Sequence, residues 1–180
     1  MTDSWTLTAA DGELQILTGV GGPAAKMGHR LTIAMASWQA TVDWRAGKPV
    51  AAALVVDVDS LQVLKGEGGV TPLTGPEKVV VRTNALKSLD AKKYPQIRFE
   101  AGSITKTKAG YRMTGEVQIH GTTAPQTVDL VVTDSGGVWV MSAEVGVVQS
   151  AFGVKPYSLL MGTMKVADEV TLRFTARHPK

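Results

Sequence analysis

Three histidines, His29, His120 and His178, are the side chains of this sequence best suited to bind a metal or to move a proton near neutral pH. None of them forms a short-range ligand pair with another histidine or with a suitably spaced carboxylate, and the chain has no cysteine. Protein metal sites need several such ligands together, so we predict no metal site. His29 follows Gly28 and opens an apolar strand, where it would contact either a polar ligand group at a pocket mouth or a local hydrogen-bond partner.

Carboxylates and serines give little sign of catalysis. Asp57 and Asp59 would share one face of a strand, but nothing around them in the sequence would raise a carboxyl pKa as acid–base chemistry requires. Ser150 has no neighbouring base, and the chain lacks the Gly-x-Ser-x-Gly turn of many hydrolases. We therefore predict that the protein is not an enzyme; the catalytic alternative would need Asp57 or Asp59 beside His29.

Cofactor and nucleic-acid binding are also disfavoured. Gly19-x-Gly21-x-x-Ala24 imitates a dinucleotide motif, but a long strand follows it instead of the helix that such a motif requires. The formal net charge is +3, yet the 19 Lys and Arg are scattered among 16 acidic residues without a basic stripe. We predict no cofactor and no nucleic-acid partner.

The length and composition fit one folded domain, residues 1–180. Hydrophobic residues make up 44% of the chain, which is enough for a sizeable core. The apolar runs are short, so we expect no membrane-spanning segment, which would need about 20 apolar residues. The first residues, MTDSWTL, do not resemble a signal peptide, and we expect a cytoplasmic protein.

Alternating apolar and polar residues predict strands along most of the chain. The pattern is clearest in residues 166–177 and in residues 115–132, where two strands flank a break at Gly121 to Pro125. We also expect single strands at 30–44, 50–63 and 138–148, shorter ones at 5–8, 13–18, 96–103, 104–108 and 111–114, one helical turn at 24–27, and a loop at 65–75. About eight strands joined by tight turns predict an all-β antiparallel up-and-down barrel or a sandwich.

One substantial helix is expected to begin at Pro76 and to end near Asp90, because proline suits the first helical position. Val79, Leu86 and Leu89 would then share one face of the helix. The β-branched run at residues 79–81 leaves a strand as the alternative.

Several segments, taken together, resemble the YceI family. They are Gly28-His29 before a long strand, Leu89-Asp90 before Lys93-Tyr94-Pro95-x-Ile97-x-Phe99, the hairpin Gly115-x-Val117-x-Ile119-x-Gly121-x-Thr123, and Asp168-x-Val170. The resemblance spans nearly the whole chain. It implies a lipocalin-like antiparallel barrel with a helix, whose apolar lumen holds a polyisoprenoid or similar lipid.

On this basis we predict that the protein binds or carries an isoprenoid or other long apolar lipid in the barrel lumen. The polar head of the lipid would lie near His29. The segments Gln149–Gly153 and Thr83–Leu86 carry fewer charges than their counterparts in many relatives, so a neutral amphiphile is as plausible as a pyrophosphate lipid. The alternative is a filled barrel acting as a homodimeric or stress-associated interaction module. The predicted lumen residues are Leu31, Ile33, Met35, Val117, Ile119, Leu130, Leu172 and Phe174.

Overall fold

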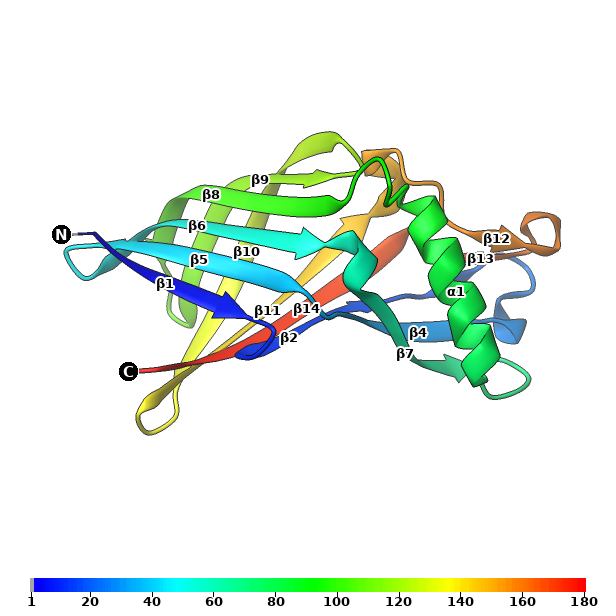
Figure 1. Cartoon of the computed structure of the whole chain (residues 1–180), viewed down its shortest axis with the longest axis horizontal. Coiled ribbons are helices and arrows are strands. Elements are labelled where there is room, and N and C mark those ends of the chain that lie inside the picture. Colours follow the sequence, from blue (N-terminus) through cyan, green and yellow to red (C-terminus); the bar gives the residue numbers. More distant parts are fainter. Residues whose placement is uncertain (1) are drawn as a thin grey trace.

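The structure is a computed structural model that describes residues 2–180 and consists mainly of antiparallel strands (Figure 1). Eleven strands form one sheet in the order β1-β5-β6-β8-β9-β10-β11-β14-β2-β4-β7. Their bounds are β1 (Thr2–Thr8), β2 (Gly12–Leu17), β4 (His29–Met35), β5 (Trp38–Arg45), β6 (Lys48–Asp57), β7 (Leu61–Gly68), β8 (Gln96–Lys106), β9 (Gly110–Ile119), β10 (Thr122–Asp134), β11 (Val138–Val148) and β14 (Glu169–Pro179). A second sheet has the order β12-β13-β3, with β3 (Val20–Gly21), β12 (Ser158–Leu159) and β13 (Met164–Val166).

The helical elements are few. The described chain contains one α-helix, α1 (Gly75–Ser88), and four short 3₁₀ turns, η1 (Ala25–Met27), η2 (Val58–Ser60), η3 (Gln149–Phe152) and η4 (Leu160–Gly162). No helix within residues 2–180 combines the length and the hydrophobicity needed to cross a membrane.

Three long strands bend at one level, which explains why more strands are seen than predicted. The first long strand consists of β1 and β2, the second of β4 and β5, and the third of β6 and β7. Backbone hydrogen bonds join the bends of the second and third: Ala36 N donates to Ser60 O (3.2 Å), and Asp57 N donates to Ser37 O (3.0 Å). Counting these halves together leaves eight long strands in the eleven-stranded sheet. Pairing of β14 with β2, and of β2 with β4, curls the sheet around one interior. The predicted antiparallel, lipocalin-like class is confirmed.

The bends correct two sequence predictions. Residues 30–44 and 50–63 are not single regular strands, because the first is interrupted at Ala36 and Ser37 and the second at η2. The first interruption reverses the alternation, so Met35 and Trp38 are both buried although they lie an odd number of residues apart. The loop predicted at 65–75 is also shorter, because β7 continues to Gly68.

The hairpin of β9 and β10 turns at His120 and Gly121, and β10 resumes at Thr122 instead of after Pro125. Both turn residues have positive φ, 52° and 72°, as two-residue hairpin turns of type I′ require. A Cβ atom at Gly121 would lie 2.6 Å from the ring of Tyr94, so this position needs glycine for space as well as for conformation. The ring of His120 packs against the same tyrosine, with ring centroids 4.7 Å apart.

Helix α1 lies across one end of the sheet (Figure 1). Thr74 and Glu77 form a capping box at its start, with Pro76 in the first turn, so the predicted start is confirmed. Arg82 fastens the helix to the bend, because its guanidinium donates to the carbonyl oxygens of Leu61 (2.8 Å) and Asp59 (2.5 Å). Val79 is 65% exposed, whereas Leu86 and Leu89, which were expected on the same helix face, pack against the core.

The end of the barrel far from α1 is filled by side chains. Trp38 and Phe174 meet edge to face there, with ring centroids 5.4 Å apart. Leu7, Met141 and Ala176 are buried in the same cluster as Trp38. Near this end the rings of Trp5 and His178 stack across the gap between β1 and β14, with centroids 3.9 Å apart. His178 is therefore part of β14 and its packing.

Candidate ligand-binding cavity

The opposite end of the barrel is hollow. A cavity of about 640 Å³ lies between α1, the inner face of the main sheet and the small sheet of β3, β12 and β13. This volume falls within the range of about 300–1,000 Å³ that is usual for small-molecule sites. The two ends of one barrel thus differ in kind, since one is packed and the other has space for a ligand.

Aliphatic side chains from several strands make the inner wall. Met35 ends β4 and Leu61 begins β7, both at the level of the bends, and they are almost fully buried beneath the cavity. Ile33, from β4, and Leu172, from β14, continue the wall. The alternation of each strand turns these residues inward, so the surface facing the cavity is mainly apolar.

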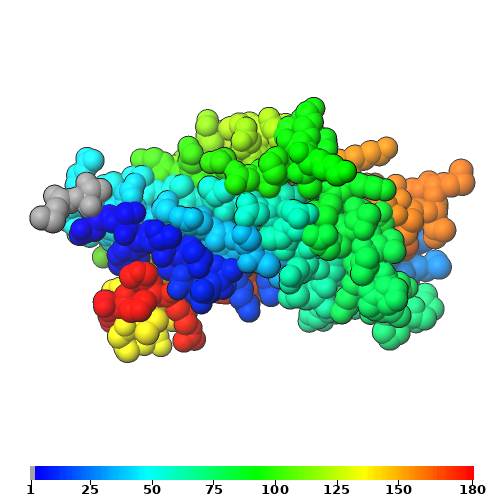
Figure 2. All heavy atoms as spheres, viewed as in Figure 1, coloured from blue at the N-terminus to red at the C-terminus, as the bar shows by residue number. Residues whose placement is uncertain are grey.

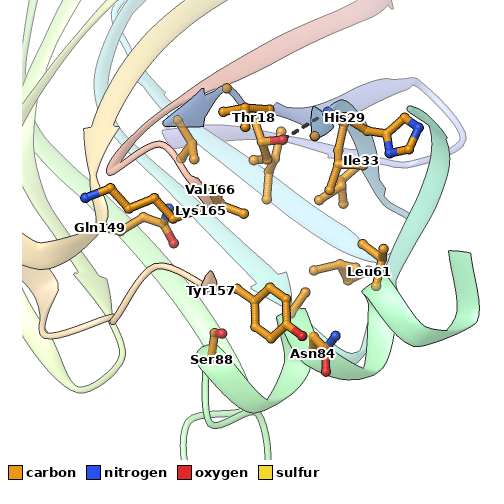
Figure 3. Close-up of a pocket in the computed structure, with 18 of the residues that line it drawn as sticks. Thr18, His29, Ile33, Leu61, Asn84, Ser88, Gln149, Tyr157, Lys165 and Val166 are labelled. Atoms are coloured by element: carbon orange, nitrogen blue, oxygen red, sulfur yellow. Dashed lines mark hydrogen bonds between the residues drawn. The ribbon is translucent and has the colours of Figure 1, made fainter. Parts of the chain in front are cut away.

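Part of the polar lining comes from the helix and from the segment between β11 and β14. Asn84 and Ser88 come from α1; Figure 3 shows the ring of Tyr157 close to both, and Gln149 and Lys165 together farther along the wall. The side-chain amide of Gln149 is held in place, because its Nε2 donates to the carbonyl oxygen of Ala167 (3.1 Å). Amide, hydroxyl and phenol groups, with one ammonium, suit a small polar head better than a multiply charged one.

His29 lines the cavity but is already hydrogen-bonded within the protein. Its Nε2 lies 2.6 Å from the carbonyl oxygen of Thr71, so Nε2–H donates to that oxygen. A Cβ atom at Gly69 would lie 2.7 Å from Nε2, so this glycine leaves the space that the ring occupies. Of the two roles that the sequence left open, a structural hydrogen bond is the one observed.

Two carboxylates near the cavity are held by local hydrogen bonds. At the start of α1 the pKa of Glu77 is lowered, first by the backbone hydrogen bond from Thr74 and then by the side chain of Thr74. The pKa of Asp168 is lowered by hydrogen bonds from the side chain and then the backbone of Ser150. Ser150 Oγ donates to Asp168 Oδ2, so this serine fixes the start of β14.

The groups considered for catalysis have separate partners. Asp57 accepts from Ser37 Oγ (2.6 Å), Asp59 meets the guanidinium of Arg82 (3.5 Å), and His29 bonds to a backbone carbonyl. None of the hydrogen bonds found in residues 2–180 links either aspartate to His29. Within the same residues, no group of three or more His, Asp or Glu side chains could hold a metal ion.

Five of the eight predicted lumen residues lie in the cavity wall. They are Leu31, Ile33, Met35, Ile119 and Leu172. The other three pack elsewhere in the interior: Val117 is buried beside Phe99, while Leu130 and Phe174 pack against the cluster that contains Trp38. The periodicity predicted inward side chains, but it did not reveal at which level along a strand the interior changes from packed to hollow.

The polar residues of the cavity were anticipated only in part: the two segments considered for the head group contain Gln149 and Asn84, whereas Ser88, Tyr157 and Lys165 were not predicted. Asn84 and Ser88 are spaced four residues apart on α1, a spacing that brings two side chains onto one helix face and could have drawn attention to them. Residues 154–166, which supply Tyr157 and Lys165, show no useful alternation because their strands are only two and three residues long.

Known proteins resemble this chain in sequence pattern and in fold. Residues 5–178 match the family model described as a YceI-like domain. The crystal structure of Burkholderia cenocepacia BcnA superposes with a TM-score of 0.70 at 22% identity, covering 94% of this chain and 98% of that one. A Campylobacter jejuni YceI protein superposes with a TM-score of 0.60 at 14% identity, covering 82% and 84%.

A search of curated proteins found no match. At these identities the two solved structures support the fold, whereas the family model covers nearly the whole sequence. The chain therefore belongs to the YceI-like family.

Proposed function

We propose that this protein binds a single lipid with a long apolar chain, an isoprenoid or a comparable molecule, in the hollow end of its barrel. One observation carries the proposal: the barrel has a cavity of about 640 Å³ whose wall is mainly aliphatic, with a small number of polar side chains. Each methylene transferred from water into such a site contributes about 0.8 kcal/mol, so a chain of many methylenes supplies affinity without charged contacts. Membership in the YceI-like family supports lipid binding in general.

The proposed head group is neutral or weakly polar. Asn84, Ser88 and Tyr157 offer donors and acceptors, while among the described residues the wall includes the ammonium of Lys165 and the carboxylate of Glu77, which caps α1. A pyrophosphate would carry several negative charges into a site without a cluster of arginines, which usually bind such groups. A quinone, an alcohol or a fatty acyl head fits this set of side chains better.

Extraction of the purified protein with organic solvent, followed by mass spectrometry, tests the proposal directly. We expect a lipid at close to one molecule per chain. The matched variants are Ala85→Phe, which fills the cavity from α1, and Thr83→Phe, which adds the same ring to an exposed position of the same helix. Loss of lipid in the first variant alone would support the cavity as its site. An extract without lipid from protein made in several hosts, together with no uptake of a fluorescent fatty-acid or prenyl probe, would refute the proposal.

The proposal includes a carrier role without catalysis and a cytoplasmic location. A carrier returns its lipid unchanged, so mass spectra of a bound lipid before and after prolonged incubation should be identical. Fractionation of cells that make the tagged protein tests the location. A homodimer stays a prediction, which light scattering of the purified protein can decide.

A further inference from the structure

Large apolar side chains are exposed around the cavity opening. Met27 in η1 is 53% exposed, Val70 before α1 is 76% exposed, and Met161 in η4 is fully exposed. Leu159 and Leu160 beside Met161 are also exposed. We call these five residues the apolar rim; Met27, Val70 and Leu159 also line the cavity. Exposing several large apolar side chains around one opening is unfavourable in water, and such a patch marks an interaction surface.

The most exposed part of the rim is held away from the body of the protein. Leu160 and Met161 have positive φ values, 53° and 56°, which are unusual for residues other than glycine. The turn that contains them extends beyond α1 at one end of the long axis, drawn in orange in Figures 1 and 2. Ala24 N donates to Thr163 O (2.7 Å), so this turn is joined to the segment of Met27.

Three segments of the chain form the rim, and the two that contain Met27 and Leu159 to Met161 carry only positively charged side chains near it. Between Glu13 and Asp43 the charged residues are Lys26 and Arg30, and between Glu144 and Asp168 they are Lys155 and Lys165. All four cations are exposed. The third segment contributes Glu67 and Glu77, but Glu67 pairs with Lys65 (3.1 Å) and Glu77 caps α1.

We propose that the apolar rim docks on the surface of a lipid bilayer that contains anionic lipids, with Leu160 and Met161 inserted among the head groups. Apolar side chains at a tip, with cations beside them, are the combination that holds a protein at such an interface. A second copy of the chain fits less well, because its rim would bring the same cations together. The inference goes beyond the proposed function and does not depend on an occupied cavity.

If both hold, the geometry connects them. The rim borders the cavity opening, so a docked molecule would place that opening at the bilayer surface. A lipid could then pass between bilayer and cavity with less of its chain exposed to water.

A label at the tip tests the docking directly, because the chain has no cysteine of its own. Met161→Cys, carrying an environment-sensitive dye, should shift its emission to the blue when vesicles of phosphatidylcholine with about one third phosphatidylglycerol are added. Val131→Cys is the control, since Val131 is 43% exposed on β10 of the barrel wall. Equal shifts at both sites, or none at residue 161, would contradict the proposed orientation.

Sedimentation with the same vesicles tests the contributions of the side chains. The double variant Leu160→Asn with Met161→Asn removes the apolar tip, and asparagine tolerates the positive φ of both positions. We expect this variant to partition onto the vesicles at least tenfold more weakly. Lys26→Gln should weaken partitioning about fivefold on anionic vesicles and have little effect on pure phosphatidylcholine. Unchanged partitioning in both variants would overturn the proposal.

Uptake of a soluble prenyl probe, measured without vesicles, keeps the two proposals separate. The tip variants should retain this uptake, whereas Ala85→Phe should lose it and still sediment with vesicles. Sedimentation that requires an empty cavity would mean that the protein extracts lipid without docking by its rim, which also overturns the inference.

Discussion

The two ends of the barrel are built from the same long strands, yet one is packed and the other is hollow. At the packed end, Trp38 and Phe174 fill the space between the walls. At the hollow end, the inward positions are occupied by smaller aliphatic residues such as Ile33 and Leu172, and α1 stands over the opening. The sheet therefore does not determine whether its interior is filled, because the size of the inward side chains and the helix position decide it at each level.

The largest expected difference between the two ends comes from a matched pair of leucines. Leu130→Ala removes a side chain that packs against the cluster of Trp38 outside the cavity wall, and it should cost about 2–4 kcal/mol of unfolding free energy. Leu172→Ala enlarges an existing cavity, so part of the packing cost is absent and we expect less than half that loss. Urea denaturation of lipid-free protein measures both. Equal losses would mean that the hollow end is not hollow in solution.

A smaller effect is expected from overpacking. Ala176→Phe inserts a ring at a position that is 2% exposed and should cost about 1–3 kcal/mol or more, because the neighbours cannot move aside. Ala85→Phe places the same ring in the cavity, where we expect a change of about 1 kcal/mol or less. Thermal unfolding of the two variants, compared with Thr83→Phe, distinguishes these outcomes. A destabilised Ala85→Phe would argue that the space is smaller than it appears.

The smallest expected effect on stability concerns the N-terminal cap of α1, a helix found only at the hollow end. Thr74→Ala removes the hydroxyl from the capping box and should cost about 1 kcal/mol. The depressed pKa of Glu77 has a related pH dependence. A carboxylate with a lowered folded-state pKa stabilises the fold above its unfolded pKa, and this contribution is lost as the pH falls through the folded pKa.

Hydrogen exchange of the amides in α1 measures that loss. Exchange in α1, corrected for the intrinsic effect of pH, should accelerate on acidification below the usual carboxyl range, before the core strands β9 and β14 open. In the variant Glu77→Gln, the amides of α1 should already exchange faster at neutral pH than in the unmodified protein, and acid should change their exchange rate little. Simultaneous opening of helix and strands would show that the cap does not act locally.

The sequence predicted the elements better than the cavity. Alternation located β11 and β14, and Pro76 located the start of α1, because these signals depend on neighbouring residues. The bends at Ala36 and Ser37 depend on contacts with η2, some 20 residues away, so no local pattern reported them. The same limit applies to β14, where alternation predicted both Phe174 and Leu172 as lumen residues because they are two residues apart. Only Leu172 lines the cavity.

The pairing of β14 with β2 has a consequence for biosynthesis. Thr171 lies opposite Leu17 in this pairing, so the ring of strands stays open until residues from nearly the whole chain have been synthesised. At a synthesis rate of about 5–20 residues per second, β2 therefore waits roughly 8–30 seconds for this neighbour. Unpaired strand edges promote aggregation, so a chaperone that shields them during translation should raise the yield of this protein more than that of an all-helical one.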